Sequence, residues 1–225
     1  MVKHKKKDLK RDEFKEAIQE LIIFYKHHRK VFIGIIIGIV ATLILSFSYR
    51  KFKISRFERS KEQYNIAVAL FDNGRFEEAK SRFKLLTEEY WGTIFANRAV
   101  FMLACISYKE GNLDEAISKF QDFLKTKYDE LFTPNAYEGL AQCYEQKGDF
   151  QKAIENYKIA LDKFKNNLGK AECMISLARI YLAEQKIEEA KKMLKEVIET
   201  SENYEIIREA ERKLKLIQVQ EELNE

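Results

Sequence analysis

The sequence predicts an all-α protein, with a single transmembrane helix followed by an α-solenoid of about four helix pairs and a capping helix. Three observations predict this class. The 225 residues include only one proline and eight glycines, which leaves few positions for hairpin turns. One run of 19 residues carries no charge, and from residue 60 onward the chain repeats with a period of 37 residues.

The overall composition excludes several classes of protein. Apolar residues make up 46% and charged residues 34%, enough to fill a core and cover a helical surface, which argues against intrinsic disorder. The scarcity of proline and glycine excludes collagen-like and proline-rich chains. The 40 Lys and Arg residues nearly balance the 36 Asp and Glu residues, so we expect no nucleic acid among the partners.

Residues 1–30 form a basic, partly amphipathic tail that contains ten Lys or Arg residues. Its apolar residues recur at helical spacing, which predicts a helix lying on the membrane surface or against a partner. These residues are Phe14, Ile18, Leu21, Ile22 and Tyr25. All three histidines, at positions 4, 27 and 28, lie beside Lys or Arg and lack ligands at metal spacing, so no metal site is predicted.

The uncharged run at residues 31–49 is predicted to be a transmembrane helix. At 1.5 Å per residue it would be about 28 Å long, close to the thickness of the hydrocarbon core. A cleaved signal peptide is the alternative, because residues 46–48 (Ser-Phe-Ser) have a small-x-small pattern. Thirty residues precede the run, however, which is unusual for a signal peptide. Gly34, Gly38 and Thr42 form a small-residue face that suits helix dimerisation, so a homodimer is possible.

The charges beside this run leave its orientation open. The ten basic residues of the tail favour a cytoplasmic N-terminus. Residues 50–59 form a basic juxtamembrane linker, and the charges nearest the membrane favour the opposite orientation. Six of these charges follow the run (Arg50, Lys51, Lys53, Arg56, Arg59 and Lys61), and three precede it (Lys26, Arg29 and Lys30).

Four units repeat between residues 60 and 202, and the same residue types recur in fixed columns. Gly74, Gly111 and Gly148 share one column, with Gln185 in the fourth unit. Glycine suits a tight turn between antiparallel helices because it tolerates a left-handed backbone. A second column holds small residues that allow helices to approach closely, and a third holds large residues that fill the gaps between them. These columns are Ala79, Ala116, Ala153 and Ala190, and Phe83, Phe120, Tyr157 and Leu194.

This column set resembles the tetratricopeptide repeat (TPR). The resemblance implies units at 60–93, 94–130, 131–167 and 168–202, each a pair of helices A and B, with helix A of the third opened by Pro134. Residues 203–225 are expected to form a capping helix, with Ile206, Ala210, Leu214 and Ile217 at helical spacing. The A helices of such a solenoid line a concave groove.

In TPR proteins, residues two, five, nine, twelve and thirteen of each unit usually face this groove. We call the corresponding residues the groove positions. They are Lys61, Tyr64, Val68, Phe71, Asp72, Arg98, Phe101, Cys105, Tyr108, Lys109, Asn135, Glu138, Gln142, Glu145, Gln146, Glu172, Ile175, Arg179, Leu182 and Ala183. The first half is aromatic with basic edges and the second half is mostly polar, which predicts binding of an extended or helical peptide with apolar anchors.

Two alternatives apply to these side chains. The aromatic residues Tyr64, Phe71, Phe101 and Tyr108 could instead pack inside the domain. A carboxylate clamp, as in some chaperone-binding TPR proteins, is not expected, because Tyr64 and Val68 stand where the clamp has Lys and Asn. Trp91, in the first loop between units, could be an exposed anchor or a lid on the helices, and the lid is the favoured expectation.

The three cysteines are expected on A helices as small buried side chains. Their odd number and the lack of C-x-x-C spacing exclude a disulfide framework or a structural zinc site. One bridge between neighbouring A helices stays possible if the domain lies outside the cytoplasm. The cysteines are Cys105, Cys143 and Cys173.

No catalytic motif is present, so we expect neither enzymatic activity nor a cofactor. The repeats contain no histidine, no G-x-S-x-G, no phosphate-binding glycine loop and no H-E-x-x-H. The carboxylate pairs at 77–78 and 188–189 fall at the start of predicted B helices, where they complement the helix dipole.

The layout of a basic tail, one membrane span and a repeat domain resembles the bacterial ancillary Sec translocon subunit family. The resemblance implies a single-pass inner-membrane protein with a cytoplasmic N-terminus and an extracytoplasmic TPR domain. It also implies a chaperone-like role, with translocon subunits, secretory proteins and membrane lipid as partners. Two alternatives remain: a structural assembly factor of an envelope or cell-division complex, and a docking adaptor that faces the cytoplasm.

Overall fold

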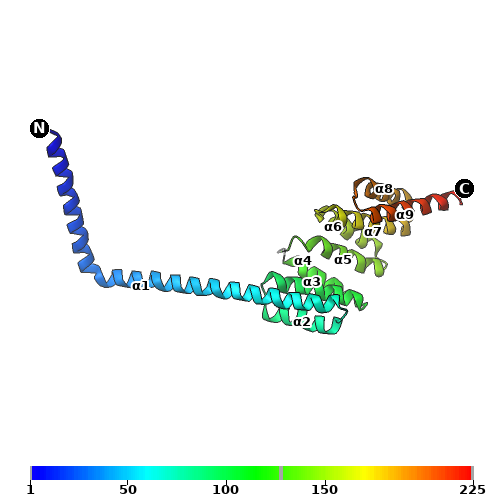
Figure 1. Cartoon of the computed structure of the whole chain (residues 1–225), viewed down its shortest axis with the longest axis horizontal. Helices are drawn as coiled ribbons and strands as arrows, with labels where there is room; N and C mark the ends of the chain where they lie inside the picture. The colour runs from blue at the N-terminus through cyan, green and yellow to red at the C-terminus, as the bar shows by residue number, and fades with distance from the viewer. Residues whose placement is uncertain (1, 127–128, 224–225) are drawn as a thin grey trace. The chain divides into compact units, whose positions relative to one another are not determined.

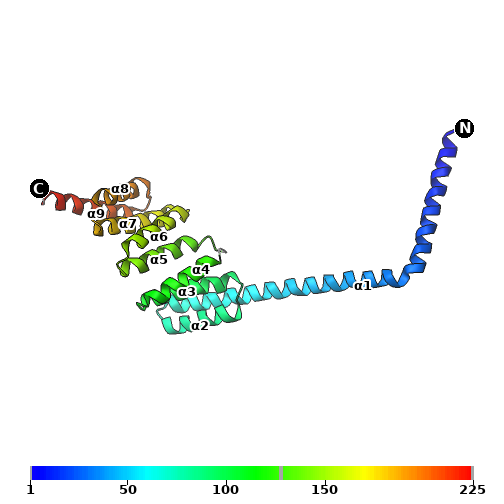
Figure 2. The ribbon, with the colours of Figure 1, turned by 180° about the vertical axis from the view of Figure 1, so that it is seen from behind.

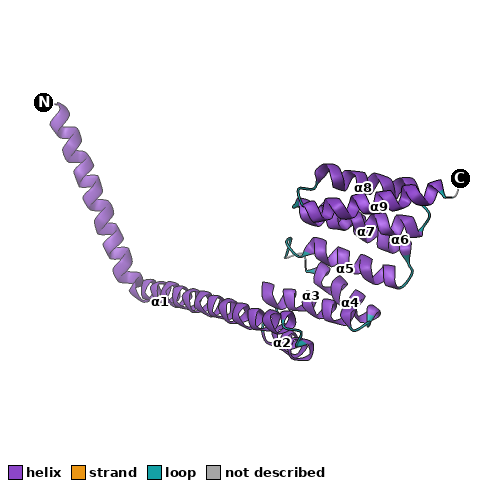
Figure 3. Ribbon diagram, turned by 45° about the vertical axis from the view of Figure 1, so that its right-hand side comes forward, coloured by secondary structure: helices purple, strands orange, loops and turns teal. Residues whose placement is uncertain are grey.

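The computed structural model describes residues 2–126 and 129–223, apart from the side chains of residues 2–14 and 17. Within these ranges every regular element is an α-helix, which confirms the predicted fold class (Figure 3). The chain divides into two compact units. We call residues 1–56 the anchor unit and residues 57–225 the repeat unit.

Helix α1 extends over Val2–Asp72 (Figure 1). The tail, the span, the linker and the first repeat helix that the sequence predicts form a single helix in this stretch, with non-helical backbone angles at His28 (φ −107°, ψ 19°). Residues 50–59 contain neither glycine nor proline, so nothing ends the helix after the apolar run. The side chains of His4 and Phe14 lie outside the described residues.

The described part of α1 includes a helix long and apolar enough to cross a membrane. Its most apolar 18-residue window has a mean hydropathy of 2.6, and none of that window is buried inside the protein. Within the run, the Thr42 hydroxyl donates a hydrogen bond of 2.8 Å to the carbonyl oxygen of Gly38. The polar group of Thr42 is therefore satisfied by its own helix, as a low-dielectric environment requires.

In the described residues of the repeat unit, the end of α1 is followed by eight further helices, which alternate in direction (Figure 2). The A helices are the end of α1, α3, α5 and α7, and the B helices are α2, α4, α6 and α8. The bounds are α2 Phe76–Glu89, α3 Ile94–Lys109, α4 Leu113–Lys125, α5 Thr133–Gln146, α6 Phe150–Lys163, α7 Asn167–Ala183, α8 Ile187–Thr200 and α9 Tyr204–Glu222. Pro134 lies in the first turn of α5, as predicted.

The four turns from helix A to helix B share one geometry. Gly74, Gly111 and Gly148 have φ values of 74°, 78° and 76°, and Gln185, in the same column, has a φ of 58°. After each of these residues, the next backbone N–H bonds to the carbonyl five residues earlier, at 2.8 to 2.9 Å. This is the Schellman arrangement, which satisfies a carbonyl at the helix end. The glycine column therefore marks the turns, as the sequence predicted.

The core consists of two clusters of buried side chains that both include residues of α5. The column of small residues (Ala79, Ala116, Ala153 and Ala190) is fully buried in these clusters. Gly139 on α5 lies against the ring of Phe120, which would be 2.3 Å from an added Cβ atom. Small side chains at fixed columns thus allow neighbouring helices to pack closely, with dense contacts along the solenoid.

Candidate protein-binding groove

Two of the predicted groove positions belong to the core of the repeat unit. Tyr64 is 7% exposed and Phe101 is 9% exposed. The Tyr64 ring packs between Phe83 and Phe95, with centroid distances of 5.9 and 5.6 Å. Burial raises the pKa of the Tyr64 hydroxyl to about 12. The expectation that these rings line the surface of the groove is corrected here: both side chains stabilise the packing of helices, as the alternative interpretation held.

The other apolar groove positions of the first half are partly buried. One of the two core clusters contains the buried Tyr64 and Phe101, and the side chains of Val68, Phe71 and Tyr108 pack against it. The ammonium of Lys109 covers part of this surface, since it lies 5.9 Å from the ring centroid of Phe71. Lys61, at the start of the groove, is exposed. The first half of the groove therefore presents less apolar surface than its sequence suggested.

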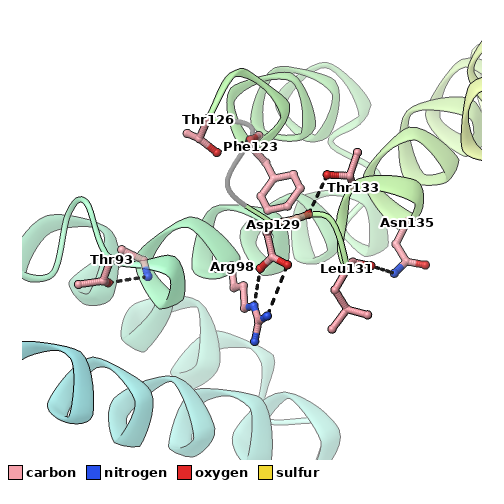
Figure 4. Close-up of polar contacts among 9 residues, drawn as sticks. Thr93, Arg98, Phe123, Thr126, Asp129, Leu131, Thr133 and Asn135 are labelled. Atoms are coloured by element: carbon pink, nitrogen blue, oxygen red, sulfur yellow. Dashed lines mark hydrogen bonds and ion pairs between the residues drawn. The ribbon is translucent and has the colours of Figure 1, made fainter. Parts of the chain in front are cut away.

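Arg98 is bound to its own chain (Figure 4). Its Nε donates to Oδ2 of Asp129 at 2.5 Å, and the Asp129 side chain is only 3% exposed. The guanidinium also lies 4.7 Å from the ring centroid of Phe132. The Asp129 carbonyl accepts a hydrogen bond of 2.7 Å from the Thr133 hydroxyl, which fixes the start of α5. Arg98 therefore holds the α4–α5 loop against α3.

The second half of the groove contains an open pocket of about 590 Å³. Six of its eight lining residues are groove positions, so the structure brings them together: Tyr108, Gln142, Glu145, Gln146, Arg179 and Ala183, beside Phe150 and Ser176. Gln146 Nε2 donates to the Tyr108 hydroxyl at 2.7 Å. Arg179 Nη2 lies 2.9 Å from Glu145 Oε2, and Arg179 stays exposed. The pocket thus offers charged and neutral hydrogen-bonding groups from three A helices.

A second pocket, of about 830 Å³, adjoins the first and shares Arg179 and Ala183 with it. Its far wall is formed by α9, with Lys213, Leu216 and Gln220. These residues were not predicted as groove positions, because the last helix was expected only to cover the core. The 37-residue period could have identified them, since Leu216 and Gln220 follow Arg179 and Ala183 by that interval.

Helix α9 has one apolar and one polar exposed face. Leu216, Val219 and Leu223 are exposed and lie at helical spacing. The other exposed face of α9 is polar. Its residues Arg208, Glu211, Lys215 and Gln218 stand 37 residues after four residues of α7 that are buried. The polar face is suited to water, as in a capping helix, whereas the apolar stripe is available to a partner.

The remaining groove positions of the second half are largely acidic or amide side chains. Glu138 is partly buried, and burial, followed by the nearby Glu172 carboxylate, raises its pKa. The Asn135 amide makes only a long contact of 3.5 Å, with the Leu131 carbonyl. The described residues include no group of three or more side chains that could hold a metal ion.

The three cysteines lie on α3, α5 and α7, and all are free thiols. Cys143 and Cys173 are fully buried. Burial raises the pKa of Cys143 to about 11 and the pKa of Cys173 to about 12. Cys143 and Cys173 are therefore small core side chains, as predicted, whereas Cys105 is only partly buried.

Trp91 differs from the expectation. Its side chain is 70% exposed in the α2–α3 loop, so the prediction that it covers the helices as a lid is wrong. The loop is short, and Gly92, with a φ of 76°, turns the chain directly into α3. The ring therefore borders a hollow at this end of α3 and does not close it.

Comparisons with known proteins agree with this architecture. The family model described as "Tetratricopeptide repeat-like domain" matches residues 23–143, more than half of the chain, and the model described as "Tetratricopeptide repeat" matches residues 132–203. A search of curated proteins found no significant match.

Several solved structures have a similar fold. A tetratricopeptide repeat protein from Parabacteroides merdae is 17% identical with a TM-score of 0.58, and the match covers 72% of this chain and 60% of that one. BtubC from P. vanneervenii is 20% identical with a TM-score of 0.54, covering 63% and 62%. A chain of the APC/C hetero-tetramer Cut9-Hcn1 is 16% identical with a TM-score of 0.58, covering 68% and 29%. The chain thus spans less than two thirds of the length of each of these proteins.

Proposed function

The chain belongs to the tetratricopeptide repeat-like family, and from this premise we propose that it is a membrane-anchored scaffold that binds other proteins in its groove. TPR proteins generally act as non-enzymatic interaction scaffolds. The observation that carries the proposal is the pair of adjoining pockets that runs from Tyr108 across Arg179 to Leu216. Concave surfaces with a few polar groups beside apolar side chains are typical of binding sites.

The anchor is part of this proposal. The family match begins at residue 23 and therefore includes the whole apolar run at 31–49 together with the first repeats. The run is long enough to span a membrane as a single helix. We place the N-terminus in the cytoplasm and the repeat unit on the other side of the inner membrane, in line with the ten basic residues of the tail.

The chemistry of the pockets indicates the type of segment that would bind. Leu182 and Leu216 offer contacts for an apolar side chain of the partner. Arg179, paired with Glu145, can exchange that carboxylate for an acidic group or a carbonyl of the partner. Apolar residues flanked by polar groups occur in unfolded secretory and envelope proteins, so we assign these as clients, with a chaperone-like role beside the translocon.

Site-specific photo-crosslinking in cells tests this function. A photoreactive amino acid is placed at Gln142 or at Leu216, one in each pocket. The matched control carries it at Lys195, an exposed residue of α8 that lines neither pocket. We expect the two groove positions, and not the control, to crosslink secretory or envelope proteins, translocon subunits or periplasmic chaperones.

Two results would contradict the proposal. Equal crosslinking from Lys195 and from the groove positions would show that the groove is not the binding surface. Recovery of only stable division or envelope components, without translocon subunits, chaperones or secretory proteins, would exclude the translocon role. In that case the protein would be an assembly factor of such a complex.

A further inference from the structure

The loops that lead from a B helix to the next A helix lie at one edge of the repeat unit. Because A and B helices alternate in direction, the N-terminal ends of α3, α5, α7 and α9 share this edge. The repeat unit also begins there: the ring of Phe57 lies 5.2 Å from that of Phe95, the second residue of α3. We call this surface the entry edge and define it by Phe57, Trp91, Leu131, Leu168 and Tyr204.

Ion pairs connect successive loops of the entry edge. Arg98, near the start of α3, binds Asp129 in the loop before α5. The next residue, Glu130, binds Lys165 in the loop before α7, with an N–O distance of 2.9 Å. The loops therefore form a continuous border of the repeat unit from α3 to α7.

Large apolar side chains are exposed along this border. The exposed fractions are 70% for Trp91, 69% for Leu131, 47% for Leu168 and 68% for Tyr204. In the opposite turns, at 72–76, 109–113, 146–150 and 183–187, Phe76 is the one exposed large apolar residue, at 39%. Each junction between a B helix and the next helix thus places one apolar side chain in solvent, either in the loop (Trp91 and Leu131) or in the first turn of the following helix (Leu168 and Tyr204). This asymmetry indicates a contact surface.

We propose that the entry edge rests on the lipid surface of the membrane in which α1 is anchored. This inference depends on the anchored function proposed above. Only residues 50–56 separate the apolar run from Phe57, and seven residues span about 10 Å as a helix and about 25 Å when extended. The anchor therefore keeps the edge within reach of the bilayer, where tryptophan and tyrosine side chains prefer the interface.

The charges of the loops indicate which property of the membrane matters. The charged residues described in these loops are Asp129, Glu130, Lys165 and Glu202. Asp129 pairs with Arg98 and Glu130 pairs with Lys165, so little unpaired charge remains in the loops. The loops themselves are consequently attracted only weakly to anionic headgroups, and partitioning of their apolar side chains into the interface supplies the binding of the loops. The contact should form on zwitterionic lipids.

A hollow of about 430 Å³ beside Trp91 adds to the fit. Its walls include Ile94, Val100 and Asn97. In the described part of the chain, the Asn97 Nδ2 group is buried and has no hydrogen-bond acceptor. The hollow is lined mainly by apolar and small side chains beside the Trp91 ring, a surface suited to the apolar part of the lipid interface.

Fluorescence of the full chain in phosphatidylcholine vesicles tests the proposal, because Trp91 is the one tryptophan of the sequence. Lipids brominated near the headgroup quench a tryptophan that touches the interface. We expect these lipids to quench the emission of Trp91. The matched control combines Trp91→Phe with Asn112→Trp, in an exposed turn of the opposite edge, and should keep its emission. Equal quenching in the two proteins, or none in either, would overturn the proposal.

A third probe separates this inference from the proposed function. The Trp91→Phe, Leu45→Trp double variant places the fluorophore in the apolar run. If brominated lipids quench the Leu45→Trp probe but not Trp91, the anchor stands and the entry-edge contact is wrong. If the Leu45→Trp probe is not quenched, α1 does not insert, and the anchored function and the entry-edge contact are both rejected.

Discussion

Gly139 is the residue at which the packing of α5 on α4 is most sensitive to size. A Cβ atom there would lie 2.3 Å from the Phe120 ring, which is itself held by Phe101. We expect Gly139→Ala to destabilise the repeat unit by about 1–3 kcal/mol, because the ring cannot move without disturbing the core. Urea unfolding of the full chain in detergent checks this. The Gly139→Ala, Phe120→Leu double variant should recover part of the lost free energy of unfolding. If Gly139→Ala leaves the free energy of unfolding unchanged, the packing described here is wrong.

Gln185 occupies a backbone conformation that favours glycine. Its φ of 58° matches the turns at Gly74, Gly111 and Gly148. A left-handed conformation is unfavourable for a residue with a side chain, so Gln185→Gly should stabilise the protein by about 0.5–1 kcal/mol. The matched exchange, Gly148→Gln, should destabilise it by a similar amount. Unfolding midpoints of the two variants measure both effects, and changes of the same sign would refute the argument.

The buried thiols make stability depend on alkaline pH. In the folded protein the pKa of Cys143 is raised to about 11 and that of Cys173 to about 12, whereas unfolded thiols ionise near about 8.5. Above that pH the unfolded state loses protons that the folded state retains. Each thiol therefore lowers the free energy of unfolding by about 1.4 kcal/mol per pH unit, until its folded pKa is reached.

Removing one thiol isolates this effect. Cys173→Ala should show a shallower fall in unfolding free energy between about pH 9 and 10 than the unchanged protein, with a smaller difference below about pH 8. Denaturant titrations at each pH measure the two slopes. Identical slopes would mean that Cys173 ionises equally in the folded and unfolded states.

Residue types identified the repeat but not the exposure of each groove position. Tyr64 and Phe101 stand in columns that face the groove in TPR proteins, yet both are core residues. A column fixes the direction of a side chain from its helix. How deeply that side chain is buried depends on neighbours such as Phe83 and Phe132. These neighbours come from other segments of the chain, so their packing cannot be read from the sequence around the groove position.

At the scale of elements, the α4–α5 loop is held by a partly buried ion pair. Asp129 is nearly inaccessible and bonds Arg98 at 2.5 Å. We expect Asp129→Ala to destabilise the repeat unit by about 3 kcal/mol, because it leaves the Arg98 charge without its partner. The neighbouring Glu130→Ala is the control, since its pair with Lys165 is exposed, and should leave stability unchanged. Thermal unfolding of the full chain compares them, and equal effects would contradict this role.

Helix positions were predictable because each depends on local signals. Glycine turns and Pro134 place the ends of several helices, and the structure confirms them. The continuous α1 was not predicted, since a membrane span, a linker and a repeat helix have different compositions but no breaker between them. The groove wall on α9 was missed because only the core-facing residues of this helix (Ile206, Ala210, Leu214 and Ile217) were considered. The structure places these residues in or against the core, whereas Leu216 lies on another face and is exposed.

For the whole molecule, the charge is divided between two parts of the chain. Residues 1–59 contain 15 basic and 6 acidic side chains, a net charge of +9, and residues 60–225 contain 25 and 30, a net charge of −5. The overall +4 and the negative mean hydropathy of −0.42 thus average a basic, apolar segment with an acidic solenoid. Such averages cannot identify the partner, because in the proposed function recognition depends on the few side chains that line the two pockets.

The orientation of α1 should depend on two opposing groups of basic residues. If the tail dominates, an alkaline phosphatase fused after Glu225 will be active, and protease added to spheroplasts will digest the repeat unit. Neutralising Lys5, Lys6 and Lys7 should then lower the active fraction. Neutralising Lys51 and Lys53, on the other flank, should keep or raise it, since these charges favour the cytoplasm for the repeat unit. An inactive fusion with a protected repeat unit would place the groove in the cytoplasm and exclude secretory clients.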